Sequence, residues 1–299
     1  MDVEPRLDRA TQAFVLHRSL LFTVAYEMLG SAADAEDVVQ ETWLRWVDVP
    51  IDTVRDPRAF LVRIVARQAL NRLRTLARRR ETYTGPWLPE PLLTAPDVAD
   101  DVEFAESLSM AMLLVLETLS PVERAVFVLR DVFDVDYDEI AQAIEKSPTT
   151  VRQIAHRARK HVAERRRRQA PSQRETRAAV ESFRHAVETG ELQEFLDILA
   201  PDVVMVADGG GNVLALSYPV SGSEKVANLI AVSWNKVGAQ IALSPVPVNG
   251  SPALVMTLGG ELHSVVSLQL EHGLVTGIHI VRNPEKLSRV RRETVLSRR

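Results

Sequence analysis

Residues 137–168 read YDEIAQAIEKSPTTVRQIAHRARKHVAERRRR, and this stretch decides the fold of the middle of the chain. Its apolar spacing predicts a short helix that ends at Ile144, and Glu145 and Lys146 then form a turn. Ser147 and Pro148 start a longer helix, because serine can cap the first amides and proline fits the first helical position. Two helices joined by so tight a turn have the layout of a helix-turn-helix.

The longer helix is predicted to have one apolar and one polar face. Its inward face consists of Val151, Ile154, Ala155, Ala158 and Val162. The polar stripe carries donors and acceptors that can reach phosphates and base edges, namely Thr149, Arg152, Gln153, His156 and Lys160. An ordinary solvated amphipathic helix is the alternative, but the cap, the turn and the polar stripe together favour a DNA-reading helix.

The composition is that of a globular protein, with 46% hydrophobic and 25% charged residues in 299. A chain of this length predicts about two or three domains. The absence of cysteine excludes disulfides, cysteine nucleophiles and cysteine-bound zinc or iron–sulfur sites. No apolar run is long enough to span a membrane and the start is too polar for a signal peptide, so we expect a cytoplasmic protein.

The charge of the chain is unevenly distributed. The formal net charge is -4, which by itself does not suggest a nucleic-acid partner. Residues 58–80, however, contain eight arginines and no acid, whereas residues 97–106 are acidic. Local basic patches can bind nucleic acid while the total charge is negative.

Residues 9–80 have an all-helical pattern. The first helix shows an apolar stripe, and Gly30 ends it. The second runs from the capping Ser31 to Trp46, and the third begins at Pro57. The stripe of the first helix consists of Ala13, Leu16, Leu20, Val24 and Met28.

Residues 86–106 form a linker that is rich in proline and acids. Its segment WLPEPLL contains Trp87, Leu88, Leu92 and Leu93, which are poor choices for a tether in water. We therefore expect a segment that is docked on another surface, and a featureless tether is the alternative.

From residue 171 onwards the pattern changes to two helices, a strand, a further helix and four more strands. Helices followed by a mostly antiparallel meander predict an α+β domain. Asp208, His263 and His279 are the candidates for acid–base catalysis here. Nothing in their spacing links the three, and Asp208 before three glycines is first of all a turn residue.

A family resemblance links these segments. Residues 34–43, DAEDVVQETW, resemble the polymerase-binding helix of bacterial sigma factors, and residues 57–80 resemble their helix facing the promoter −10 element. Residues 119–124, LSPVER, together with the helix-turn-helix resemble the region that reads the −35 element. Two such regions without a third between them are typical of the extracytoplasmic-function sigma factors.

Residues 171–299 are similar to the SnoaL-like extension carried by one subgroup, the SigJ type. Three short motifs support this: WLPEP at 87–91, DGGG at 208–211 and NPEKL at 283–287. Asn212 and Glu285 depart from the subgroup, where lysine and aspartate are expected. The implied fold is two all-α sigma domains followed by an α+β, cone-shaped SnoaL-like domain. The implied boundaries are 1–85, a linker at 86–106, 107–170 and 171–299.

The resemblance implies three partner surfaces and no cofactor, metal or catalytic residue. Core RNA polymerase would contact Asp37, Val38, Val39, Gln40 and Glu41. Promoter DNA would meet Thr149, Thr150, Arg152, Gln153, His156 and Lys160 at −35, and Arg58, Arg63 and Arg67 at −10. The extension would regulate in cis through Trp87, Leu88, Pro89, Asp208, Gly209, Gly210, Gly211, Asn283, Pro284 and Leu287.

Two other functions stay open at this point. One is a one-component regulator that binds operator DNA by itself and senses a ligand, although the helices before residue 81 would then be unexplained. The other is an enzyme similar to polyketide cyclases, which share the SnoaL-like fold. The sequence names neither a promoter nor a small ligand for the cavity of the carboxy-terminal domain.

Overall fold

The computed structural model describes the backbone of residues 3–80, 83–95, 98, 101–165, 171–213, 215–237 and 240–298. The side chains of 3–6, 77–80 and 234–237 lie outside the description, as do the predicted basic run at 166–168 and part of the linker. The chain divides into two compact units. One comprises residues 1–81, 115–166 and 295–299, and the other comprises 82–114 and 167–294.

The first unit begins with a three-helix module, which we call the first helical module (residues 1–80). Its elements are α1 (Val3–Leu29), α2 (Ala32–Trp46), the 3₁₀ turn η1 (Ile51–Thr53) and α3 (Pro57–Arg80). Ser31 caps α2 as predicted, because its side chain accepts a hydrogen bond from the amide of Asp34 at 3.2 Å. The indole of Trp46 donates to the carbonyl of Ala10 at 2.8 Å and ties α2 to α1.

One residue of the predicted stripe on α1 lies on the wrong face. Leu20, Val24 and Met28 are buried, but Leu16 is 77% exposed. The buried set instead includes Leu21 and Ala25, so the core-facing stripe of α1 is broader and rotated relative to the predicted one.

The second helical module (residues 115–165) completes the helical part of this unit. Its elements are the end of α5 (Met110–Glu117), α6 (Pro121–Phe127), the π-helical turn η3 (Val128–Val132), α7 (Tyr137–Ile144) and α8 (Pro148–Arg165). Ser120 and Glu123 form a reciprocal capping box at the start of α6. The helix α4 (Val102–Leu108) precedes α5 and belongs to the other unit.

The second unit is built on one six-stranded sheet with the strand order β2-β1-β6-β5-β4-β3. All neighbours are antiparallel except β1 and β6, which are parallel. The predicted α+β class is confirmed, whereas β2 and the parallel pair were not predicted. The strands are β1 (Leu199–Asp208), β2 (Val220–Ser221), β3 (Ile241–Val248), β4 (Ser251–Leu258), β5 (Glu261–Glu271) and β6 (Leu274–Val281).

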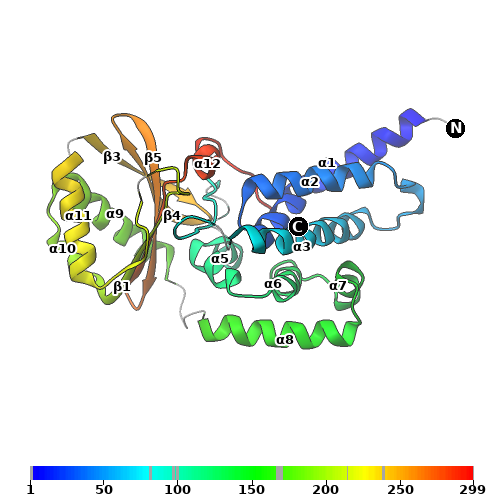
Figure 1. Cartoon of the computed structure of the whole chain (residues 1–299). Coiled ribbons are helices and arrows are strands. Elements are labelled where there is room, and N and C mark those ends of the chain that lie inside the picture. Colours follow the sequence, from blue (N-terminus) through cyan, green and yellow to red (C-terminus); the bar gives the residue numbers. More distant parts are fainter. Residues whose placement is uncertain are drawn as a thin grey trace. The chain divides into compact units, whose positions relative to one another are not determined.

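Three helices cover one face of this sheet: α9 (Gln173–Thr189), α10 (Gln193–Leu196) and α11 (Ser223–Val237) (Figure 1). Apolar side chains such as Phe183, Phe195 and Val266 fill the space between these helices and the sheet. The opposite face packs against the linker and the short helix α12 (Pro284–Leu287), with the 3₁₀ turn η5 (Ser288–Arg291) following it.

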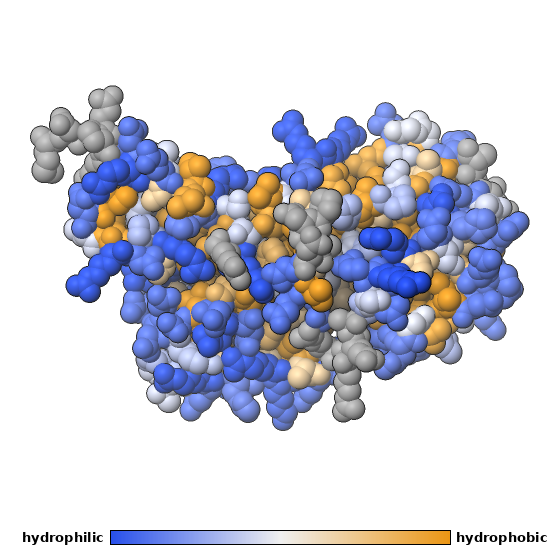
Figure 2. All heavy atoms as spheres, turned by 180° about the vertical axis from the view of Figure 1, so that it is seen from behind, coloured by the Kyte–Doolittle hydropathy of each residue, from blue (hydrophilic) through white to orange (hydrophobic). Residues whose placement is uncertain are grey.

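The surface seen in Figure 2 is mostly hydrophilic, with separate groups of apolar side chains among the charged ones. No helix in the described part of the chain is long and apolar enough to cross a membrane.

Candidate nucleic-acid interface and linker clamp

The corner between α7 and α8 has the predicted geometry. Glu145 adopts a left-handed backbone with φ of 55°, and the amide of Lys146 donates to the carbonyl of Ala141 at 3.0 Å. The hydroxyl of Ser147 accepts from the amide of Thr150 at 3.2 Å and thus caps α8. The helix-turn-helix expected within residues 137–168 is confirmed over the described part, residues 137–165.

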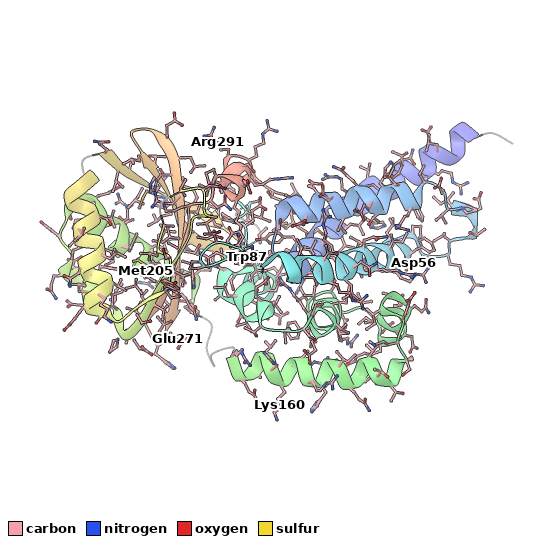
Figure 3. All side chains as sticks on the ribbon, viewed as in Figure 1. Asp56, Trp87, Lys160, Met205, Glu271 and Arg291 are labelled. Atoms are coloured by element: carbon pink, nitrogen blue, oxygen red, sulfur yellow. The ribbon has the colours of Figure 1, made fainter. Side chains whose placement is uncertain are left out.

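The two faces of α8 also follow the sequence pattern. The five predicted inward residues are all buried. Thr149, Arg152, Gln153, His156 and Lys160 are exposed, and Lys160 projects from the open side of the helix (Figure 3).

A surface hollow on α8 is lined by Arg152, Gln153, His156 and Arg157. Arg157 was missed from the sequence, although it is exposed and follows His156 directly. The guanidinium of Arg152 lies 5.4 Å from the centre of the Tyr137 ring, a cation–π contact that supports its position.

The predicted polymerase face of α2 divides into two groups. Asp37, Gln40 and Glu41 are exposed. Val38 and Val39, by contrast, are only 1% and 2% exposed, so their side chains belong to the core of the module. This corrects the expected contact set, because a buried valine supports the helix and cannot meet a partner directly.

The loop before α3 and the start of α3 border a cavity of about 350 Å³. Asp56, labelled in Figure 3, caps α3 by accepting from the amide of Ala59 at 3.0 Å. The described residues that line the cavity are Thr53, Val54, Arg55, Asp56, Ala59, Phe60, Arg63, Glu139 and Gln142.

The predicted −10 arginines are in different surroundings. Arg63 donates to Gln142 of α7 at 2.7 Å, and Arg67 forms an ion pair with Glu145. Arg58 instead lies near His17, where burial and the charge of Arg58 lower the pKa of the imidazole. Arg63 and Arg67 thus both contact the helix-turn-helix, whereas Arg58 contributes its charge beside α1.

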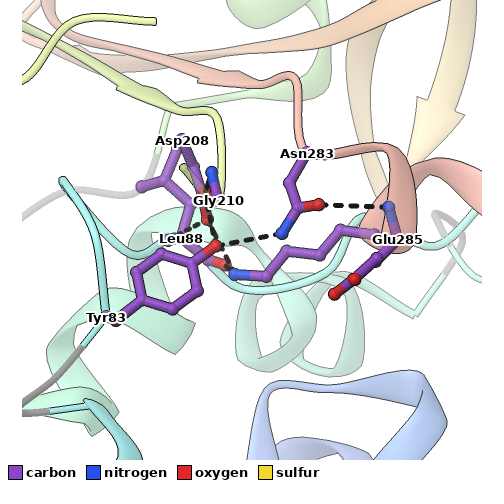
Figure 4. Close-up of polar contacts among 7 residues, drawn as sticks. Tyr83, Leu88, Asp208, Gly210, Asn283 and Glu285 are labelled. Carbon is purple, nitrogen blue, oxygen red and sulfur yellow. Dashed lines mark hydrogen bonds and ion pairs between the residues drawn. The ribbon is translucent and has the colours of Figure 1, made fainter. Parts of the chain in front are cut away.

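The linker is held by a buried carboxylate, that of Asp208 at the end of β1. Its side chain accepts four hydrogen bonds (Figure 4). Oδ1 accepts from the hydroxyl of Tyr83 at 2.7 Å and from the amide of Gly210 at 3.0 Å. Oδ2 accepts from the amide of Leu88 at 2.9 Å and from Nζ of Lys286 at 2.7 Å.

Lys286 completes this arrangement from α12. Its Nζ also donates to the carbonyl of Leu88 at 2.6 Å, and it lies 4.2 Å from the centre of the Trp87 ring and 5.0 Å from that of Tyr83. The backbone amide and the backbone carbonyl of Leu88 therefore both form hydrogen bonds, the first with Asp208 and the second with Lys286. We call Tyr83, Asp208, Asn283 and Lys286 the linker clamp.

Asn283 and Gly210 explain two of the motifs in the carboxy-terminal domain. Nδ2 of Asn283 donates to the hydroxyl of Tyr83 at 3.0 Å, and Oδ1 of Asn283 accepts from the backbone amide of Glu285. A side chain at Gly210 would place its Cβ 2.3 Å from Nδ2 of Asn283, and the φ of 63° also favours glycine. Gly210 is thus required for the close approach of the two loops.

The predicted interdomain residues are largely brought together by the structure. Leu88 and Leu287 share one apolar cluster, Pro89 is buried, and Trp87 lies over Lys286. Pro284 is exposed and faces a cavity near α12 instead. Tyr83 and Lys286 were missing from the predicted set, although Lys286 stands inside the NPEKL motif.

A second anchor of the linker was not predicted. Asn249, in the turn between β3 and β4, accepts from the amide of Leu92 at 2.8 Å through its side chain. Its own amide donates to the carbonyl of Leu92 at 2.9 Å, and its Nδ2 donates to the carbonyl of Leu108 at 3.0 Å. The Asn-Gly pair at 249–250 signals a hairpin turn, but its sequence gives no sign of the linker.

The three candidate catalytic residues are hydrogen-bonded or buried within the carboxy-terminal domain. Asp208 is 0% exposed and has all its acceptor positions used. His263 bonds Arg282 at 2.8 Å, and burial lowers the pKa of His279 to about 4. Within the described residues no group of three or more histidines and acids could hold a metal ion.

Comparisons with known proteins agree with this geometry. The family models "Sigma-70 region 2" and "Sigma-70, region 4" match residues 13–79 and 109–162. The ECF RNA polymerase sigma factor SigJ of Mycobacterium tuberculosis is 36% identical over 295 residues, covering 91% of each chain. The probable ECF RNA polymerase sigma factor SigI of the same species is 31% identical and covers 96% of this chain and 97% of its own. The crystal structure of SigJ matches with a TM-score of 0.75 at 33% identity, over 93% of this chain and 98% of that one.

Proposed function

Because the chain belongs to the extracytoplasmic-function family of RNA polymerase sigma factors, we propose that its carboxy-terminal domain regulates promoter recognition in cis through the linker clamp. As a sigma factor, the protein binds core RNA polymerase and directs transcription from specific promoters. This activity assigns it to the cytoplasm, where the polymerase works.

The polymerase contact is proposed to run along Asp37, Gln40 and Glu41. These side chains share the exposed face of α2. Val38 and Val39 lie on its buried face, in the core of the first helical module. Arg72 of α3 steadies this face, because it pairs with Asp34 at 2.9 Å and also with Asp37.

Promoter DNA is proposed to meet two surfaces. Arg152, Gln153 and His156 would read base edges of the −35 element in the major groove, and Thr149, Thr150 and Lys160 would hold phosphates. At the −10 element, the cavity before α3 would receive an opened base, with Arg58, Arg63 and Arg67 beside the strand.

The observation that supports the regulatory proposal is that both backbone polar groups of Leu88 form hydrogen bonds with the linker clamp. Its amide and its carbonyl are bound by Asp208 and Lys286, so the linker lies on the carboxy-terminal domain and not free in solvent. Because this linker joins the helices of the first module to the helix-turn-helix, its fixation limits where the two DNA-reading modules can go.

Catalysis is not part of the proposed function. The carboxylate of Asp208 already accepts four hydrogen bonds and cannot act as a base without breaking the clamp. Burial lowers the pKa of His279 to about 4, so its imidazole is neutral near pH 7. A one-component regulator is disfavoured, because it leaves the sigma region 2 match at residues 13–79 without a role.

Transcription in vitro with core polymerase and a library of promoter fragments tests the proposal. The full chain is compared with a chain that ends at residue 168 and with Trp87→Ala, which removes the ring over Lys286. Tyr218→Ala, an exposed aromatic outside the clamp, serves as the control. We expect truncation and Trp87→Ala to change promoter output and the control to leave it unchanged. Equal output from all four would refute regulation in cis, and no specific transcript from any would refute the sigma assignment.

A further inference from the structure

A cavity of about 470 Å³ lies in the carboxy-terminal domain next to α12. This volume is within the range of pockets that bind small molecules. The cavity is separate from the space between the sheet and α9, α10 and α11, which apolar side chains fill. The described residues that line it are Val213, Leu262, His263, Arg282, Pro284, Leu287, Ser288 and Arg291.

The charge of the lining has a single sign. Arg282 and Arg291 both line the cavity, and none of the described lining residues is an acid. Arg282 is half-buried, whereas Arg291 is exposed. An anion in the cavity that meets both guanidinium groups gains charge-assisted hydrogen bonds.

His263 orients Arg282 without supplying a negative charge. Nη2 of Arg282 lies 2.8 Å from Nε2 of His263, and since a guanidinium can only donate, Nε2 must accept. The imidazole is therefore neutral, with its proton on Nδ1, 3.3 Å from the hydroxyl of Ser264. Burial and the charge of Arg282 lower the pKa of His263, in agreement with this state.

The other lining residues of the cavity indicate what kind of group the anion would carry. Val213, Leu262 and Leu287 are apolar, whereas Ser288 adds a hydroxyl group to the lining. The lining thus combines two cationic side chains with apolar ones. Inorganic ions alone would leave the apolar walls without a partner.

We propose that this cavity binds a small organic anion, a carboxylate or a phosphate monoester with an apolar body, whose charged group meets Arg282 and Arg291. The site adjoins the linker clamp, because the backbone amides of Arg282 and Asn283 both donate to the carbonyl of Asp208, at 2.7 and 2.9 Å. Binding is therefore coupled to the clamp, and this coupling, unlike the binding itself, rests on the proposed regulation in cis.

Calorimetric titration of the full chain with benzoate and with phenyl phosphate tests the binding and distinguishes the two anions. Benzyl alcohol is the neutral control, and inorganic phosphate tests the charge without the apolar body. Arg291→Gln is expected to weaken the better organic probe about tenfold, the effect of losing one strong charged contact. Arg292→Gln, which removes an exposed arginine outside the lining, is expected to leave the affinity unchanged.

Saturable binding of an organic anion that Arg291→Gln weakens and Arg292→Gln does not would support the site. Absence of saturable binding of both anions at millimolar concentration would overturn it, as would equal binding of benzyl alcohol or equal affinity of the two variants. Transcription by the holoenzyme is then measured with and without the bound probe. Unchanged promoter output at saturation would overturn the coupling, while the truncation experiment above tests the regulation independently.

Discussion

At the scale of single residues, the clamp depends on one buried pair of opposite charges. Nζ of Lys286 lies 2.7 Å from Oδ2 of Asp208, and both residues are buried. A charge taken out of water is stable only when partners replace its hydration. Here Tyr83, Gly210 and Leu88 supply the remaining hydrogen bonds, and the two aromatic rings face the ammonium group.

Removing the cation of this pair should therefore be costly. Lys286→Met leaves the Asp208 carboxylate buried without its counter-charge, and we expect a loss of about 3–5 kcal/mol of stability. Lys225→Met, at an exposed lysine of α11, is the control. The measurements are the thermal midpoint and the hydrogen exchange of the Leu88 amide. If neither changes relative to the control, the pair does not hold the linker.

A second prediction at this scale concerns the pH dependence of stability. Burial lowers the pKa of His279 to about 4, whereas an unfolded histidine titrates near 6.5. Between these values the unfolded chain binds more protons, so stability falls as the pH drops from about 6.5 to about 4, by up to about 3 kcal/mol.

His279→Gln should remove this part of the pH dependence. The test compares the slope of unfolding free energy against pH for the native chain, His279→Gln and the control His272→Gln at an exposed turn residue. An NMR titration that gives His279 an ordinary pKa would contradict the prediction, as would three equal slopes.

At the scale of elements, the hairpin between β3 and β4 acts as the second anchor of the linker. Asn249 combines a left-handed φ of 54° with side-chain hydrogen bonds to Leu92 and Leu108. Glycine at this position keeps the backbone freedom and removes only the side chain. Asn249→Gly is therefore the variant that isolates the anchoring function from the turn.

We expect Asn249→Gly to increase the exchange rate of the Leu92 amide, since that amide loses its acceptor. Asn249→Asp keeps an acceptor for Leu92 and loses the donor to Leu108, so protection at Leu92 should persist. Gly259→Ala in the turn between β4 and β5, where no neighbour is close, controls for general turn effects. Equal exchange at Leu92 in Asn249→Gly and the native chain would contradict the anchoring.

The recognition helix α8 permits a test that separates base reading from phosphate contact. Arg152→Ala is expected to cost about 1–3 kcal/mol and to relax the promoter preference at one position. Lys160→Ala should weaken binding to all promoters equally and reduce the salt dependence. Binding of holoenzyme to a set of −35 variants at two salt concentrations distinguishes these outcomes. A uniform loss with Arg152→Ala would reassign it to the phosphates.

Elements with strong local signals were predictable, and contacts between distant segments were not. The cap at Ser147, the proline after it and the apolar spacing of α8 determine that helix locally. The docking of WLPEPLL followed from its apolar residues, but its partner Asn249 lies 157 residues from Leu92. The parallel pairing of β1 with β6 likewise depends on tertiary packing, which a sequence pattern does not contain.

At the scale of the whole molecule, the two helical modules are joined by contacts of unequal strength. Arg124 of α6 is buried and donates to the carbonyl of Glu27 in α1 at 2.9 and 3.2 Å, and it also pairs with Glu117. Arg67 of α3 pairs with Glu145 at an exposed site. Both contacts would break if the two modules moved apart to bind separate promoter elements.

The magnitudes decide which contact controls separation of the modules. An exposed ion pair contributes about 0–1 kcal/mol, whereas loss of one partner from a buried charged network costs about 3–5 kcal/mol. We therefore expect Arg124→Gln to shift the modules towards separation far more than Glu145→Gln does. Arg18→Gln, which breaks an exposed pair within the first module, is the control.

Fluorescence energy transfer between dyes on α3 and α8 measures this separation in the free chain. Low transfer in Arg124→Gln with nearly native transfer in Glu145→Gln is the expected result, because only the buried contact is strong enough to hold the modules together. Circular dichroism checks that the helices of Arg124→Gln remain folded. Native transfer in a folded Arg124→Gln chain would show that the exposed contacts and the apolar core suffice, and the closed arrangement would then not depend on the buried arginine.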